Sequence, residues 1–252
     1  QVPELSLDGV ALEVDYNNPI FTKLRGQRVV LTEITAGYDH CLADDPKQTL
    51  NVVMPLGFSA SLYGPPKSRI GPRWAKDACE EDVRATRDIC EKTAQQLAAQ
   101  LNRPVRLIVP ESQGLGGSSA PTVKQVALGY FGKYNDMLQT QLDAMHLSYG
   151  PEFEDNGIFF LGYSRGGRMA AHMAELAAEK YGTEKVLGFA SVDPAGTVIR
   201  NWPLSLIQLL KDGPSRTAYD NRFEELPSWK ELIIGYQTFG IKGLLSLEKS
   251  MG

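Results

Sequence analysis

The segment GYSRGG, residues 162–167, constrains the fold of this chain more than any other part of the sequence. It lies between an apolar run at residues 157–161 (GIFFL), typical of a strand buried on both faces, and an Ala- and Met-rich stretch at residues 165–181, typical of a helix. A strand that passes directly into a helix needs a very tight turn, and only residues with almost no side chain fit around it. The sequence therefore predicts that Ser164 occupies a strained turn at a helix N-terminus, where backbone amides favour negative charge.

Short β-branched apolar runs alternate with amphipathic stretches along much of the chain. The further expected strands are residues 28–34, 50–54, 105–109 and 186–192, and the further expected helices are residues 77–101 and 122–146. This alternation predicts an α/β fold in which helices cover a mostly parallel sheet. The polar segment 39–49 is too short for a crossover helix, so we expect the strands at residues 28–34 and 50–54 to form an antiparallel pair.

The sequence changes in character after residue 196. A possible capping box at Ser228 and Glu231 indicates a helix, and the last apolar stretch is interrupted by Gly240 and Gly243. We therefore expect a core at residues 1–196 and a helical cap at residues 197–252, which would continue in a longer native chain.

Composition excludes several classes of function. With 26 Lys and Arg against 30 Asp and Glu, the net charge is −4, and no basic cluster supplies the phosphate contacts that nucleic-acid binding needs. No apolar run is long enough to cross a membrane and no signal-peptide pattern opens the chain, so we expect no transmembrane segment. A cytoplasmic location is slightly favoured, and an exported form stays open.

The three cysteines, Cys41, Cys79 and Cys90, form no CxxC pair. An odd number without metal-ligand spacing predicts reduced, mostly buried thiols rather than a metal site or a disulfide framework, although one bridge in an exported form stays open. The sequence implies no metal and no cofactor.

The GYSRGG turn and the order of elements over residues 28–196 resemble the α/β-hydrolase superfamily. In that order antiparallel strands come first, and then strand, helix, strand, helix, strand, tight turn, helix and strand follow. The resemblance implies a three-layer sandwich with a C-terminal helical cap. It also implies a serine hydrolase of esterase or lipase type, which acts on a small-molecule acyl ester through an acyl-enzyme intermediate.

The resemblance also assigns roles to individual residues. Ser164 would be the nucleophile, and the backbone N–H of Arg165 would be one donor of the oxyanion hole. The segment at residues 54–59 (MPLGFS) looks like the family's His-Gly-Phe-type loop with Leu56 in place of His, so the N–H of Phe58 is the expected second donor. The expected substrate-contacting residues are Gly57, Ser59 and Tyr163.

A serine nucleophile needs a histidine base, and none of the three histidines fits that role. His172 lies eight residues beyond Ser164 on the same expected helix, about 12 Å along its axis. His146 ends the helix that precedes the 157–161 strand, and His40 begins the connection into the 50–54 strand, so both are expected at the amino edge of the sheet. The catalytic base is therefore not identified.

Three other features, expected at the carboxyl edge of the sheet near Ser164, have two interpretations each. Asp193 follows the 186–192 strand at the correct edge, as the acid does in a minority of the family, and it also fits a turn-capping role. The side chain of Arg165 is expected in solvent, with contact to a substrate carboxylate as the alternative. The Gly-rich segment 111–119 fits either a flexible connector or a loop that lines or gates a pocket.

The missing histidine has three explanations: a form of the chain that stops before it, a degenerate hydrolase, or a base donated by another chain. The alternative function is accordingly a non-catalytic binding or assembly module on the same scaffold. The sequence does not indicate an oligomeric state.

Overall fold

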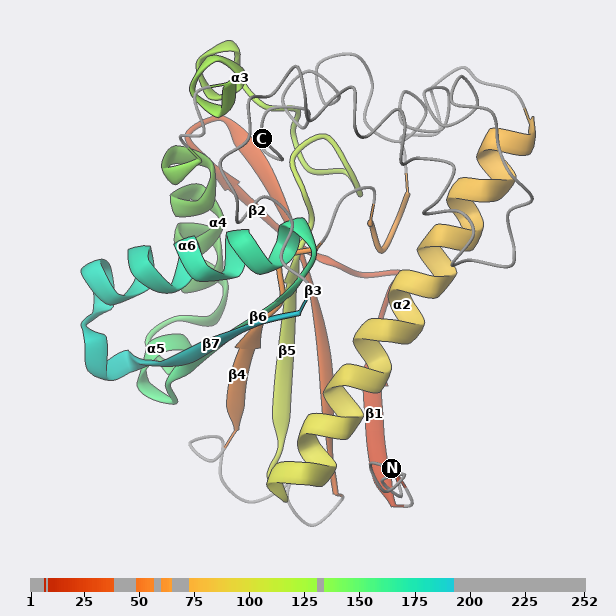
Figure 1. The fold of residues 1–252 in the computed structure, drawn as a ribbon, viewed down its shortest axis with the longest axis vertical. Coiled ribbons are helices and arrows are strands. Elements are labelled where there is room, and N and C mark those ends of the chain that lie inside the picture. Colours follow the sequence, from red (N-terminus) through yellow and green to blue (C-terminus); the bar gives the residue numbers. More distant parts are fainter. Residues whose placement is uncertain are drawn as a thin grey trace.

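The computed structural model describes residues 7, 9–38, 49–56, 60–64, 73–130 and 134–192 (Figure 1). Seven strands in this part of the chain form one sheet in the order β1-β3-β5-β4-β6-β7, with β2 also paired to β3. The strands are β1 (Val10–Val14), β2 (Ile20–Leu24), β3 (Gln27–Tyr38), β4 (Leu50–Val53), β5 (Val105–Pro110), β6 (Ile158–Tyr163) and β7 (Val186–Val192).

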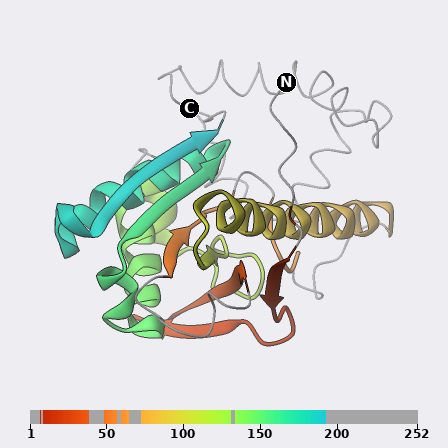
Figure 2. The ribbon, with the colours of Figure 1, turned by 90° about the horizontal axis from the view of Figure 1, so that it is seen from below.

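Helices cover both faces of the sheet. They are α2 (Arg73–Leu101), α3 (Val123–Tyr130), α4 (Asn135–Tyr149), α5 (Glu152–Asp155), α6 (Arg165–Tyr181) and a short 3-10 helix, η2 (Thr183–Lys185). Helix α2 lies along one face (Figure 2), where Cys90 and Ala94 pack against Val52 and Leu107. On the other face of the sheet, α4 and α6 pack against side chains of the strands, such as Val53 of β4. The expected α/β fold with three layers is therefore confirmed.

The order of strands corrects one prediction. β4, β5, β6 and β7 run parallel, and β3 runs antiparallel to β5. β3 and β4 do run in opposite directions, as a short connection requires, but they do not pair, because β5 lies between them. Spanning one intervening strand needs only about 10 Å, which a short connection covers easily. A short connection therefore sets the direction of the next strand but does not determine which strand it pairs with.

Two helix predictions also need correction. The single helix expected at residues 122–146 is two helices: α3 ends at Tyr130, and Tyr134 is the N-cap residue of α4. Gly129 in the last turn of α3 lowers helix propensity at this point. Helix α2 begins at Arg73, before the expected residue 77. The expected boundaries of α6 and β7 are confirmed.

The remaining sequence predictions depend on where the described residues end. Cys79 and Cys90 are buried free thiols as expected, whereas Cys41 lies outside the described residues. The expected cap at residues 197–252 and its boundary with the core at residue 196 also lie outside them. Among the residues that are described, no helix is both long and apolar enough for a membrane span.

Candidate active site

The turn around Ser164 has the geometry that the sequence predicts. Strand β6 ends at Tyr163 and α6 begins at Arg165, so Ser164 alone connects them. Its backbone has φ +54° and ψ −127°, a region that L-residues rarely occupy and that costs on the order of 1–3 kcal/mol. The Ser164 N–H donates to the carbonyl oxygen of Val192 at 2.9 Å, and its own carbonyl accepts from Gly167 N–H at 3.0 Å. These two bonds hold the strained residue in place.

The three glycines of the segment let the surrounding backbone approach the turn. A Cβ atom on Gly162 would collide with the backbone of Gly166, and one on Gly167 would collide with the hydroxyl of Ser191. A Cβ on Gly166 would collide with the carbonyl oxygen of Pro55, which follows β4. The first turn of α6 therefore lies directly against the chain that leaves β4. This contact brings the carboxyl ends of β4 and β6 together.

The other residues expected at this edge are only partly described. Tyr163, expected to contact substrate, is 54% exposed and pairs with Val192 at the ends of β6 and β7. Asp193 directly follows Val192 but lies outside the described residues. The other expected residues that lie outside them are Gly57, Phe58 and Ser59.

The side chain of Arg165 corrects a further prediction. Expected in solvent, it is only 6% exposed, and its Nε atom has no hydrogen-bond partner. Burial, with a smaller contribution from the charge of Arg168, lowers the pKa of Arg165 to about 10, while Tyr134 opposes the shift. The prediction was wrong because the first turn of α6 lies against Pro55, so the start of this helix faces the interior of the fold.

Glu111 is a buried acid at the same edge that sequence reasoning did not select. It directly follows β5 and is 1% exposed. Its carboxylate accepts hydrogen bonds from the Leu62 N–H at 2.6 Å and the Ser61 hydroxyl at 2.9 Å. Burial raises the pKa of Glu111 to about 7, although these two hydrogen bonds and the charge of Arg87 favour ionisation. The signal in the sequence was an acid placed directly after a mostly apolar strand.

The segment that follows Glu111 is attached to β3 by hydrogen bonds. The Arg28 N–H donates to the Ser119 hydroxyl at 2.8 Å, and the Val30 N–H donates to the Ser118 hydroxyl at 3.1 Å. The guanidinium Nε of Arg28 also donates to the carbonyl oxygen of Gly117 at 2.6 Å. Three hydrogen bonds therefore anchor this segment to β3, and the two interpretations of it, a connector and a loop that lines or gates a pocket, both stay open.

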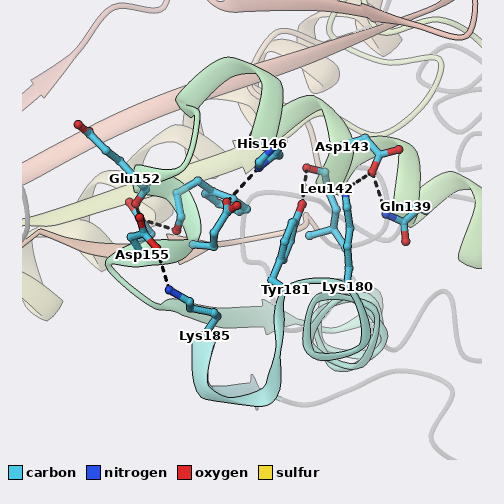
Figure 3. Close-up of polar contacts among 12 residues, drawn as sticks. Gln139, Leu142, Asp143, His146, Glu152, Asp155, Lys180, Tyr181 and Lys185 are labelled. Carbon is cyan, nitrogen blue, oxygen red and sulfur yellow. Dashed lines mark hydrogen bonds and ion pairs between the residues drawn. The ribbon is translucent and has the colours of Figure 1, made fainter.

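Neither histidine in the described part of the chain lies near Ser164. His146 Nδ1 is 3.0 Å from Glu154 Oε2, and its ring stacks on Tyr181 at the far end of α6 (Figure 3). This is the edge where β6 begins, opposite Ser164, as the sequence predicts. His172 lies two turns along α6, with Nδ1 3.5 Å from Glu175.

No metal-ligating cluster occurs among the side chains that the structure describes. The third histidine, His40, lies outside the described residues, so these residues supply no base for Ser164.

The sequence matches no protein-family model and no curated protein. Solved structures that resemble it include brefeldin A esterase, a bacterial homologue of human hormone-sensitive lipase, with 16% identity and a TM-score of 0.42. That match covers 99% of this chain and 53% of the esterase, so the chain spans about half the length of that relative.

Two further solved structures resemble the chain at a similar level. The Cif epoxide hydrolase from Acinetobacter nosocomialis has 13% identity and a TM-score of 0.46, over 97% of this chain and 66% of the hydrolase. The Pyrococcus furiosus esterase Pf2001 has 13% identity and a TM-score of 0.42, over 88% of this chain and 62% of the esterase.

The chain's own topology identifies the fold. Antiparallel strands β1 to β3 are followed by β4, α2, β5, the α3–α4 pair, β6, the tight turn, α6 and β7, in the sheet order given above. This is the succession that the sequence resemblance implied, and helices lie on both faces of the sheet. The chain therefore has the α/β-hydrolase fold.

Proposed function

We propose that this protein is a serine hydrolase that acts on a small-molecule acyl ester, with Ser164 as the nucleophile. The observation that carries the proposal is the backbone of Ser164, held at φ +54° between the carboxyl end of β6 and the first residue of α6. Such strain persists only where the surrounding structure enforces it, and it clusters at functional sites. The turn and the helix start suit a nucleophile whose reaction develops negative charge.

In the proposed reaction the Ser164 oxygen bonds to the carbonyl carbon of the ester, and the serine proton passes through a base to the leaving alcohol. Water then attacks the acyl-enzyme and releases the acid, which regenerates the serine hydroxyl. Arg165 is the first residue of α6, so its backbone N–H has no acceptor within the helix and can donate to the oxyanion. The proposal gives the second donor to Phe58, substrate contact to Gly57, Ser59 and Tyr163, and the acid to Asp193.

Labelling with a fluorophosphonate probe tests this proposal on the full-length protein. Wild-type protein should gain one probe adduct on the peptide that contains Ser164, and Ser164→Ala should gain none. Ser112→Ala is the matched control, because Ser112 is a buried serine that follows β5 at the same edge. That variant should label like the wild type.

The alternative is a non-catalytic binding or assembly module on the same fold. It is favoured by one observation: His146 and His172, the two histidines within the described residues, are engaged away from Ser164. Folded wild-type protein that shows no adduct after prolonged exposure would support this alternative and overturn the serine-hydrolase proposal.

A further inference from the structure

The side chain of Arg165 is a buried cation that has no acid partner within the described part of the chain. Only 6% of the residue is exposed, and its Nε atom has no hydrogen-bond acceptor. Burial lowers the pKa of Arg165 to about 10, so the guanidinium still carries its charge at neutral pH. A buried charge without a partner is costly, because no ion pair offsets its loss of hydration. The stability of the fold therefore gives no reason for a charge at this position.

Of the two groups that act on the charge of Arg165, one is a second cation. Arg168 opposes that charge from three residues further along α6, whereas Tyr134 favours it. The guanidinium of Arg168 lies 6.0 Å from the ring centre of Tyr134, the N-cap residue of α4. The first turn of α6 contains no acid, and Asp136 in the first turn of α4 accepts from Gln125 Nε2 at 3.1 Å. Positive charge therefore gathers where these two helices begin.

This charge lies beside the proposed nucleophile. Arg165 directly follows Ser164, which is partly exposed, at the start of the 17-residue helix α6. The Ser164 side chain makes no capping hydrogen bond, so the partial positive charge of the helix N-terminus adds to that of the two arginines. A negatively charged group a few bonds from an ester carbonyl at Ser164 is therefore attracted to this position.

Building on the proposed function, we propose that the guanidinium of Arg165 binds a carboxylate on the acyl chain of the substrate. A guanidinium donates two parallel N–H···O bonds to a carboxylate, and Nε, the atom that lacks an acceptor, forms one arm of such a fork. The carboxylate supplies the missing opposite charge. The acyl chain also stays attached to Ser164 in the intermediate, so one cation beside this residue serves both steps of the reaction. The substrates are then acyl esters that carry a negative charge.

Binding of glutarate, a small dicarboxylate, tests the site without any reaction. Glutarate should raise the unfolding temperature of the wild type above its value in sodium chloride at the same ionic strength, because a ligand that binds the folded state stabilises it. Arg165→Met should lose this rise. The matched control is Arg25→Met, which removes an equal charge from a side chain that is 61% exposed, and it should keep the rise.

Hydrolysis tests the same site as substrate preference. The two substrates are mono-p-nitrophenyl glutarate and p-nitrophenyl valerate, in which a methyl group replaces the carboxylate. The ratio of their kcat/KM values, glutarate to valerate, should fall by about 10-fold or more in Arg165→Met, because a charge-assisted hydrogen bond is lost. Arg25→Met should keep the wild-type ratio. Arg165→Lys keeps the charge but not the fork; it replaces Arg165→Met if that variant does not fold, and should lower the ratio by about threefold.

The two measurements separate the failure of this site from the failure of the proposed function. Hydrolysis of the valerate ester by the wild type, with an unchanged ratio in the folded Arg165 variant, overturns the carboxylate site alone. A wild type that hydrolyses neither ester and takes up no fluorophosphonate overturns the proposed function. In that unreactive protein, a rise with glutarate that depends on Arg165 upholds a carboxylate site, and the absence of the rise overturns it as well.

Discussion

The backbone N–H of Ser164 donates to the carbonyl oxygen of Val192 at 2.9 Å, so the last residue of β7 holds the strained turn that follows β6. β6 and β7 pair in parallel up to this point, with Tyr163 opposite Val192. The turn therefore depends on two strands rather than on its own residues alone. The energetic cost of the strained backbone at Ser164 can be measured by substituting that residue.

Replacing Ser164 with glycine should stabilise the protein. Glycine adopts positive φ without the steric penalty of a Cβ atom, so Ser164→Gly should raise the free energy of unfolding by about 1 kcal/mol. Ser164→Ala keeps the Cβ and serves as the matched control, with stability close to wild type. Urea denaturation of both variants measures the difference. Equal stabilities of the glycine and alanine variants would show that the turn stores no strain.

Adding one methyl group at Gly166 should be strongly unfavourable. The Cβ of Gly166→Ala would meet the Pro55 carbonyl oxygen, and backbone cannot move aside as a flexible side chain can. We expect a loss of about 3 kcal/mol in the free energy of unfolding and a slower reaction with the fluorophosphonate probe. Gly26→Ala is the comparison, because its Cβ would meet nothing within 4 Å and only its φ of +78° is unfavourable. That variant should lose about 1 kcal/mol.

Removing the buried charge of Arg165 should not harm the fold. The side chain is buried and its Nε lacks a partner, and an apolar side chain of similar length avoids the cost of dehydrating the guanidinium. Arg165→Met should therefore match or exceed wild-type stability, by up to about 1 kcal/mol. Arg28→Met, which loses the bond to the Gly117 carbonyl, should instead be less stable. A large loss in Arg165→Met, measured by urea denaturation, contradicts this account.

The raised pKa of Glu111 predicts a pH dependence of stability. Because the pKa is about 7 in the folded protein and 4.5 in the reference state, the folded state binds more protons between these values. The Glu111 contribution is therefore fully present below pH 4.5 and is lost as the pH rises to about 7. Between pH 5 and pH 8, the free energy of unfolding should fall more in the wild type than in Glu111→Gln. Parallel profiles for the two proteins would contradict the raised pKa.

The two histidines of the described region should be dispensable for reaction at Ser164. His146→Ala removes the contact with Glu154 and the stacking on Tyr181, so it should cost about 1 kcal/mol of stability. Its fluorophosphonate labelling rate should stay within twofold of wild type, and so should that of His172→Ala. Loss of labelling in either folded variant would identify that histidine as the base and would reverse our placement of it.

Local sequence patterns predicted the features that neighbouring residues determine, namely the limits of a helix and a strand and one tight turn. The limits of α6 follow from its composition and from Gly182 at its end, those of β7 follow from a continuous apolar run, and the turn at Ser164 follows from the glycines around it. The half-exposed strand β2 (IFTKL) has no such continuous apolar run, and it was not expected.

What could not be predicted depends on contacts between distant parts of the chain. β5 separates β3 from β4 because it pairs with both, and no local pattern records that insertion. Arg165 is buried because the first turn of α6 lies on Pro55, more than a hundred residues earlier. The hydrogen bonds of Glu111 likewise come from Ser61 and Leu62, which the sequence does not mark as its partners.

The close approach of Gly166 to the Pro55 carbonyl has a consequence for engineering. A Cβ atom at Gly166, two residues after Ser164, would collide with the Pro55 carbonyl oxygen, so any larger residue at 166 would push the start of the segment after β4 away from α6. Variant libraries that explore the substrate range of the proposed hydrolase should therefore leave residues 55 and 166 untouched. Diversity is better introduced at solvent-facing neighbours such as Tyr163.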